Sequence, residues 1–204
     1  MSSKKYKITS NTTLTPCYKT VYQIQALIDI PKYGVKKGDK GGFVEGGDNL
    51  SHEGDCWVAK EAQAYDDSRI MNGALLTGQA QAYGQAHIGE NALVTGQSHV
   101  YDSATVGGFS TVSEQAHVCE FAYVTEYAAI KGKSVLCGIA DVSGETRVGA
   151  EAVISEGAFC FEKSDPELTD IAFPSENHLR DPHHPRFDPR LVTTTTPSEK
   201  EPTA

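Results

Sequence analysis

Residues 79–102 read QAQAYGQAHIGENALVTGQSHVYD, a stretch of Ala, Gln, His and Gly with a period of six residues. Ala and Gln favour an α-helix by intrinsic propensity. A period of six nevertheless excludes a single helix, because six residues advance a helix by about 600° and would spread the Val and Ile positions over three sides. The repeat therefore has to be explained by another kind of structure.

The six-residue repeat continues in both directions and forms 18 hexads from Asp55 to Glu162, with no insertion or deletion. The second place is Ala twelve times and Ser four times, and the fourth place is Val, Ile or Leu in 15 of 18 hexads. In a strand these two places point to the same side, so both side chains enter the core. The sixth place is Gly seven times and Asp or Asn three times. These residues tolerate positive φ and form corners.

Each hexad is predicted to be one short strand and one corner, so three hexads form a triangular coil and the 18 hexads form six coils. This pattern resembles the hexapeptide repeat of left-handed parallel β-helices, which are best known from a large acyltransferase family. The resemblance covers residues 55–162 and implies the left hand, whereas the general crossover rule favours the right. The predicted fold class is all-β: a left-handed parallel β-helix of about six triangular coils, with a small N-terminal β cap and an extended C-terminal tail.

Both ends of a β-helix expose a sheet edge and apolar core, so both need covers. Residues 1–54 are predicted to form a mostly β cap, with strands within 21–30 and 34–47. Residues 36–58, KKGDKGGFVEGGDNLSHEGDCWV, look like the leader of hexapeptide-repeat proteins common in bacteriophage and prophage genomes. Residues 163–204 hold seven of the nine prolines. They are predicted to be a tail that is docked in its first part and disordered at its end.

Composition excludes several classes of partner. A net charge of −9 argues against duplex nucleic acid, because neutralising phosphates needs clustered Lys and Arg. No segment approaches the roughly 18 consecutive apolar residues of a membrane span, and no apolar run follows the basic N-terminus as in a secretory signal. The five cysteines lack CxxC spacing and are interpreted as reduced thiols. We therefore predict a cytoplasmic protein of a bacterial host cell, with no membrane partner and no cofactor.

Residues 18 apart occupy the same place in adjacent coils, so the outward third and fifth places form ladders. On the second face, which the second hexad begins, His99 and His117 are expected about 5 Å apart beside a column of tyrosines. Such rings could stack on a base or hydrogen-bond a phosphate, although stacking also stabilises coils without any ligand. No metal is predicted, because two histidines need a further ligand to hold zinc. The predicted ligand-binding residues are Tyr65, Gln81, Tyr83, His99, Tyr101 and His117, with Arg69, Lys131 and Arg147 as cations for phosphate.

The first face, begun by the first hexad, carries Trp57, Leu75 and Leu93 in a row at the third place. Exposed apolar side chains in a row indicate a contact surface. One interpretation is a homotrimer interface, which the resembling β-helix proteins usually have. The other is that the cap or the tail covers these residues.

Three functions are compatible with these observations. The favoured hypothesis is a non-catalytic, trimeric phage-type protein that binds a small ligand, for example a nucleotide immune signal of a bacterial defence system that it sequesters. The resemblance also implies an acyltransferase using an acyl-CoA donor, with His99 or His117 as general base. Such enzymes generally complete the substrate pocket with an extruded loop or a helical C-terminal domain, and neither is evident here, so no catalytic residue is predicted. The third hypothesis is a structural or accessory virion protein or scaffold.

Overall fold

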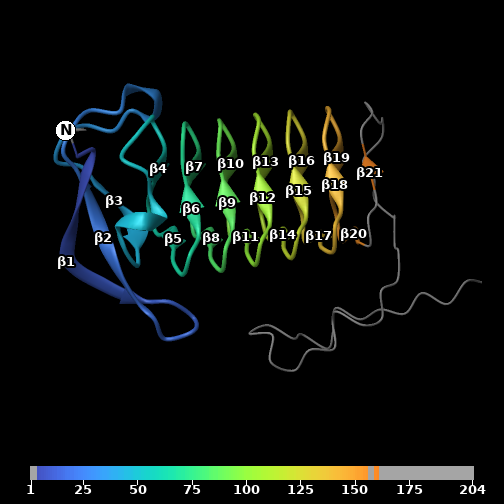
Figure 1. Ribbon diagram of the computed structural model, residues 1–204, viewed down its shortest axis with the longest axis horizontal. Coiled ribbons are helices and arrows are strands. Elements are labelled where there is room, and N and C mark those ends of the chain that lie inside the picture. Colours follow the sequence, from blue (N-terminus) through green and yellow to red (C-terminus); the bar gives the residue numbers. More distant parts are fainter. Residues whose placement is uncertain (1–3, 156–158, 161–204) are drawn as a thin grey trace, which may run out of the picture. The chain divides into compact units, whose positions relative to one another are not determined.

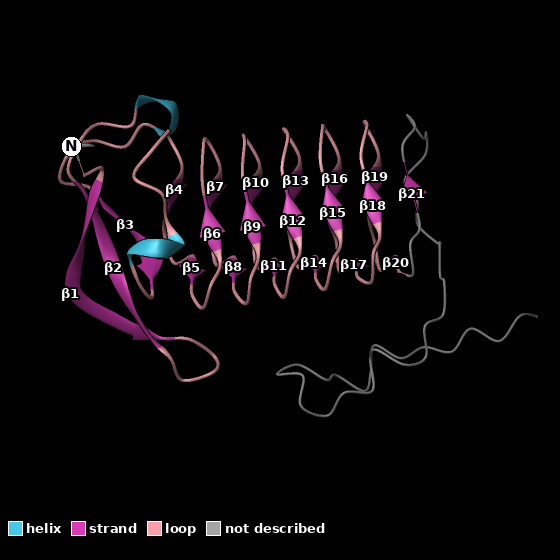
Figure 2. Ribbon diagram, viewed as in Figure 1, coloured by secondary structure: helices cyan, strands magenta, loops and turns pink. Residues whose placement is uncertain are grey.

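The computed structural model describes residues 4–155 and 159–160, and this part of the chain is all-β apart from two short 3₁₀ helices, Pro31–Tyr33 and Gly47–Asn49. Short parallel strands stack into a β-solenoid of about six turns that follows an N-terminal sheet (Figures 1 and 2). The predicted parallel β-helix of about six coils and its β cap are confirmed. The predicted tail, residues 163–204, lies outside the described residues.

Eighteen two-residue strands form the three faces of the solenoid, and each pairs in parallel with the strand 18 residues away. The first face holds β4 (Trp57–Val58), β7 (Leu75–Leu76), β10 (Leu93–Val94), β13 (Thr111–Val112), β16 (Ala129–Ile130) and β19 (Arg147–Val148). The second face holds β5 (Gln63–Ala64), β8 (Gln81–Ala82), β11 (His99–Val100), β14 (His117–Val118), β17 (Val135–Leu136) and β20 (Val153–Ile154). The third face holds β6 (Arg69–Ile70), β9 (His87–Ile88), β12 (Thr105–Val106), β15 (Tyr123–Val124), β18 (Asp141–Val142) and β21 (Phe159–Cys160).

The core of the solenoid is built from the second and fourth places of the hexad, as the pattern predicts. Ala92 and Val94, for example, are both completely buried, and Ser98 and Val100 repeat the arrangement on the next face. Ser98 donates its buried hydroxyl to the Thr95 carbonyl oxygen at 2.7 Å, which is how a polar side chain is accommodated in this position.

The corners require positive φ at the sixth place of every described hexad from Lys60 to Ala150. Gly occupies seven of these sixteen corners and Glu four, so positive φ is not confined to the Gly, Asp and Asn residues that the sequence analysis singled out. Carboxylates at this place compensate, because they accept the backbone N–H of the corner one coil later. Glu120 accepts from Gly138 at 2.7 Å in this way. The same bond joins Asp66 to Gly84, Glu90 to Gly108, Asp102 to Glu120, Glu114 to Gly132 and Glu126 to Gly144.

The cap consists of β1 (Tyr6–Leu14), β2 (Thr20–Ala26) and β3 (Lys40–Val44). Its strands are antiparallel to one another, and β3 then pairs in parallel with β5, so the second face extends into one nine-stranded sheet. The sequence predicted β2 and β3 approximately, but it did not single out β1.

The cap also covers the first coil. Trp57 is 1% exposed, and a Cβ added to Gly41 of β3 would lie 2.7 Å from its indole ring. Lys5 is equally buried and donates to the Gly54 carbonyl oxygen and to the Cys56 thiol, both at 3.1 Å. Trp57 is therefore not an exposed contact residue, and of the two interpretations of its row the covering cap applies to it.

Candidate functional site

The predicted ladder of aromatic rings is present on the second face. Tyr83 stacks between Tyr65 and Tyr101, with ring centroids 5.1 and 4.9 Å apart and interplanar angles of 5°. His99 and His117 stack at 4.8 Å and 16°, close to the predicted 5 Å. The two columns meet edge to face, because Tyr83 lies 6.1 Å from His99 and Tyr101 lies 6.1 Å from His117. We call these five rings the ring ladder.

Much of the ring ladder is buried, which limits what it can bind. Tyr65, Tyr101 and His99 are 2%, 6% and 4% exposed, whereas Tyr83 and His117 are half-buried. Tyr65 packs under the cap against Val21 and Phe43, and its hydroxyl donates to Gln81 Oε1 at 3.2 Å. Because each ring face within the ladder already lies against its neighbour, a base cannot insert between the rings. Only the edges of the half-buried rings are open to a ligand.

The buried end of the ladder continues into two thiols. Burial, and then the neighbouring thiol of Cys119, raise the pKa of Tyr101 above its ordinary value. A hydrogen bond with Cys137, followed by burial, raises the pKa of Cys119. The phenol and thiol are therefore neutral at physiological pH, and this end of the ladder packs like apolar core.

The structure does not bring the predicted phosphate-holding cations to the ring ladder. Arg69 lies on the third face in β6, and Arg147 lies on the first face in β19. Lys131 precedes the corner between the first and second faces and is half-buried. Of the three, only Lys131 is near the second face in the chain.

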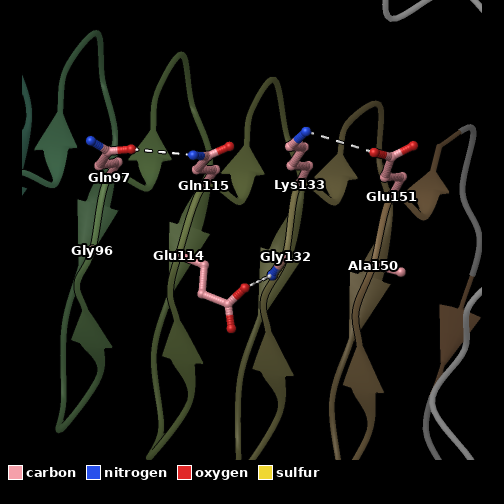
Figure 3. A pocket seen from close by; sticks show the side chains of 8 residues that line it. All are labelled: Gly96, Gln97, Glu114, Gln115, Gly132, Lys133, Ala150 and Glu151. Carbon is pink, nitrogen blue, oxygen red and sulfur yellow. Dashed lines mark hydrogen bonds and ion pairs between the residues drawn. The ribbon is translucent and has the colours of Figure 1, made fainter.

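An open groove runs along the corner that leads into the second face, and its volume is about 910 Å³ (Figure 3). The groove is lined by Gly96, Gln97, Glu114, Gln115, Gly132, Lys133, Ala150 and Glu151. Gln115 donates to Gln97 Oε1 at 3.3 Å, and Gln97 donates to Gln79 Oε1 at 2.9 Å. Lys133 lies 3.8 Å from Glu151, so the row of amides is followed by one cation and one anion.

The third and fifth places of the hexad, from which the outward ladders were predicted, do not include the residues that line the groove. Gln97, Gln115 and Lys133 occupy the first place, which the structure shows as part of the corner turn. The signal was present in the sequence, since Gln79, Gln97 and Gln115 recur at a spacing of 18. Asn and Gln ladders of this kind are known to pair along stacked strands.

Two residues that line the groove are close in the chain to two residues of the ring ladder. Gln97 lies two residues before His99, and Gln115 lies two residues before His117. Amides and a lysine offer hydrogen bonds to a polar ligand, and the half-buried rings offer aromatic edges. The described residues contain no group of three or more His, Cys, Asp or Glu side chains arranged to hold a metal ion.

Comparison with protein-family models and with curated proteins found no match. In residues 4–155 and 159–160, none of the helices has the length and apolar character required to span a membrane. The class that the structure defines is therefore a parallel β-solenoid protein with an N-terminal β cap.

Proposed function

We propose that this protein binds a small ligand without catalysis, in the corner groove and against the adjoining open edge of the ring ladder, and that the ligand is a nucleotide. The observation that supports this is that Gln97 and Gln115, which line the groove, come two residues before His99 and His117 of the ring ladder. Amides at Gln97 and Gln115 can pair with the edge of a base, because a carboxamide both donates and accepts. Lys133 offers a point charge to a phosphate.

Lys133 can bind a phosphate with little loss of stability. Its side chain is 60% exposed and that of Glu151 is 80% exposed, so their ion pair is well solvated and contributes little to stability. A phosphate that displaces Glu151 from Lys133 breaks only this weak ion pair and forms a charged hydrogen bond with Lys133 in its place. The resemblance to phage hexapeptide-repeat proteins supplies the biological setting: the ligand is a nucleotide immune signal in the cytoplasm of a bacterial host, and binding removes it from solution.

The test is whether the purified protein carries or captures a nucleotide. Mass spectrometry of small molecules released by heating should detect one, and a nucleotide panel should raise the melting temperature. A ligand at 100 times its dissociation constant stabilises a protein by about 2.7 kcal/mol. Lys133→Ala and Gln115→Ala should reduce the shift, while Lys36→Ala on the exposed surface of the cap should leave it unchanged. An empty protein with no shift from any nucleotide would contradict the proposal.

A structural or scaffold role is the second candidate, and the burial of the ring ladder favours it. Rings that pack on one another stabilise the stack of coils and need no ligand. Under this function, every nucleotide leaves the melting temperature unchanged, and Lys133→Ala has no phenotype.

The acyltransferase alternative requires a histidine that reaches the substrate. His99 is 4% exposed and its ring face is covered by His117, which does not favour this role. Release of free thiol from acetyl-CoA in the presence of amine and sugar acceptors is the test. Activity that is lost in both His99→Ala and His117→Ala would replace the proposed function.

A further inference from the structure

Exposed large apolar side chains are concentrated in one part of the solenoid. Within the described coils they all lie between residues 109 and 139 and are between 44% and 68% exposed: Phe109, Phe121, Tyr123, Tyr127 and Ile139. Such a concentration of exposed apolar area indicates a contact surface. It is not the row that the sequence suggested, because Trp57 is covered by the cap.

These side chains lie on the third face and at its two corners. Tyr123 is in β15, on the face itself. Phe121 and Ile139 are the first residues of third-face hexads, at the corner with the second face. Phe109 and Tyr127 are the first residues of first-face hexads, at the corner with the first face, and their rings stack at 5.4 Å and 8°. We call these five residues the apolar patch.

The segments that carry the apolar patch have negative charges and no positive ones. They are the third-face hexads of three successive coils with the corner residue on either side, at 102–109, 120–127 and 138–145. Their strands β12, β15 and β18 pair in parallel (Figure 1). The three segments contain no Lys, Arg or His, and they contain five carboxylates: Asp102, Glu120, Glu126, Asp141 and Glu145.

Two of these carboxylates lie beside one exposed ring. Glu126 immediately precedes Tyr127, and Glu145 occupies the same place as Tyr127 one coil later; both are exposed. Glu126 accepts a backbone N–H of the next coil, but an amide carries no net charge and leaves the surface negative. Burial, and then the charge of Glu126, raise the pKa of Asp141, which shows that the carboxylates of this face lie near enough to repel one another.

The combination of rings and carboxylates selects the chemistry of a partner. A negative surface repels nucleic acid and anionic lipid, and it also repels the same face of a second copy, since each chain carries a net charge of −9. Arg and Lys side chains are attracted to aromatic rings and to carboxylates alike. A peptide segment that contains both cations and apolar side chains is therefore complementary to this surface in charge and in polarity.

We propose that the third face, over the apolar patch, binds a cationic peptide segment of another protein that also carries apolar side chains. An Arg of the segment pairs with Glu126 or Glu145 and lies against the ring of Tyr127. The apolar side chains of the segment pack on Phe121 and Ile139. The corner groove lies at the remaining corner, between the first and second faces, so peptide binding is independent of the proposed nucleotide binding.

The test is the fluorescence anisotropy of labelled synthetic peptides titrated with the full-length protein. A peptide of alternating Arg and Leu should bind, and added salt should weaken the binding. The same peptide with Ser in place of Leu, or with Glu in place of Arg, should bind at least tenfold more weakly. Equal binding of the three peptides would overturn the proposal.

Variants locate the binding surface, and circular dichroism confirms that each is folded. Tyr127→Ser and Glu145→Lys should each raise the dissociation constant of the Arg/Leu peptide at least tenfold. The matched controls are Tyr18→Ser, which removes an exposed ring from the cap, and Glu61→Lys, which reverses an exposed charge at the first place of a second-face hexad. Both controls should bind like the wild type, and patch variants that also do so would overturn the proposal.

Two further measurements separate this proposal from other occupants and from the proposed function. Light scattering in which the wild type self-associates, and Tyr127→Ser does not, would make a second copy the occupant and overturn the proposal. Lys133→Ala, which should weaken nucleotide binding, should leave the affinity for the Arg/Leu peptide unchanged. An absence of nucleotide binding therefore leaves the peptide result intact, and an absence of peptide binding overturns only the peptide site.

Discussion

Two stacks of tyrosine and phenylalanine rings in the solenoid have nearly the same geometry and opposite exposure. In the stack of Tyr65, Tyr83 and Tyr101, neighbouring centroids are 4.9 to 5.1 Å apart, and its two outer rings are 2% and 6% exposed. In the stack of Phe109 and Tyr127 the distance is 5.4 Å, and the rings are 59% and 63% exposed. Stacking is therefore a consequence of the 18-residue repeat, and it does not by itself indicate a binding site.

The two stacks occupy different places in the hexad and differ in what covers them. The buried tyrosines occupy the fifth place, on a sheet face where the cap, the histidine column and two thiols surround them. Phe109 and Tyr127 occupy the first place, at a corner that nothing in the described part of the chain covers. The three tyrosines thus stabilise the coils, whereas Phe109 and Tyr127 remain exposed.

The largest effect that separates the two stacks is expected from truncation to Ala. Tyr101→Ala removes a nearly completely buried ring and should lower the free energy of unfolding by about 3–5 kcal/mol. Tyr127→Ala removes an exposed ring and should lower it by less than about 1 kcal/mol in the monomer. Urea unfolding at two protein concentrations distinguishes folding from association, because only association depends on concentration. Equal losses in the two variants would contradict the assignment of the stacks to different roles.

A second difference is expected at high pH. Burial raises the pKa of Tyr101 in the folded state, so the native protein favours the neutral phenol. The stability from this shift is complete below the unfolded-state value near pH 10 and is lost as the pH rises above it, at up to about 1.4 kcal/mol per pH unit. Tyr101→Phe keeps the ring and removes the proton. Its free energy of unfolding should therefore decrease less than that of the wild type between about pH 9 and 11.

Tyr6 provides an internal reference for the high-pH experiment. Burial raises the pKa of Tyr6 to about 12, and this residue is unchanged in Tyr101→Phe. Both proteins should therefore retain some loss of stability above pH 10. Identical pH profiles for the wild type and Tyr101→Phe would show that the phenol of Tyr101 ionises equally easily in the folded and unfolded chains.

A smaller effect is expected at the corner beneath the exposed stack. Glu126 adopts a φ of 56° immediately before Tyr127, and its carboxylate accepts the Gly144 N–H at 2.9 Å. Glu126→Ala loses this bond and should cost about 1 kcal/mol in urea unfolding. Glu126→Gly loses the same bond but relieves the positive φ, so it should cost less. Glu61→Ala, at the first place of a hexad, is the matched control and should be neutral. A neutral Glu126→Ala would show that the carboxylate bond does not stabilise the corner.

How much the sequence could predict depends on whether a feature follows from the repeat. The core places, the parallel register and the 5 Å stacking of His99 on His117 all follow from a strict period of six, because inward and outward positions alternate along each strand. Glu at a positive-φ corner does not follow from intrinsic preference. Its side chain compensates by accepting a hydrogen bond from the next coil, as Glu120 does from the Gly138 N–H.

The site was predicted less completely, for physical reasons that particular residues illustrate. The exposure of an outward residue depends on what covers it, and the repeat carries no information about the cap that buries Trp57 and Tyr65. First-place residues such as Gln115 and Lys133 lie outside the strands, so the alternation of inward and outward positions along a strand does not predict where they point. The groove they line, and the exposed stack of Phe109 and Tyr127, follow from the repeat only when the corner residues are also compared between coils.

The smallest effect is expected at the outer edge of an exposed ring, where a hydroxyl can be added. Phe109→Tyr adds a hydroxyl to a ring that is 59% exposed, and at dilutions where the protein is monomeric it should change the free energy of unfolding by less than about 0.5 kcal/mol. In an assembly that covers this ring, the same hydroxyl would have to find a hydrogen-bond partner or lose its hydration. A loss confined to high concentration would therefore place the outer edge of the Phe109 ring in a contact between copies. A loss of more than about 1 kcal/mol that persists on dilution would show that the chain itself covers this ring, and the contrast between a buried and an exposed stack would fail.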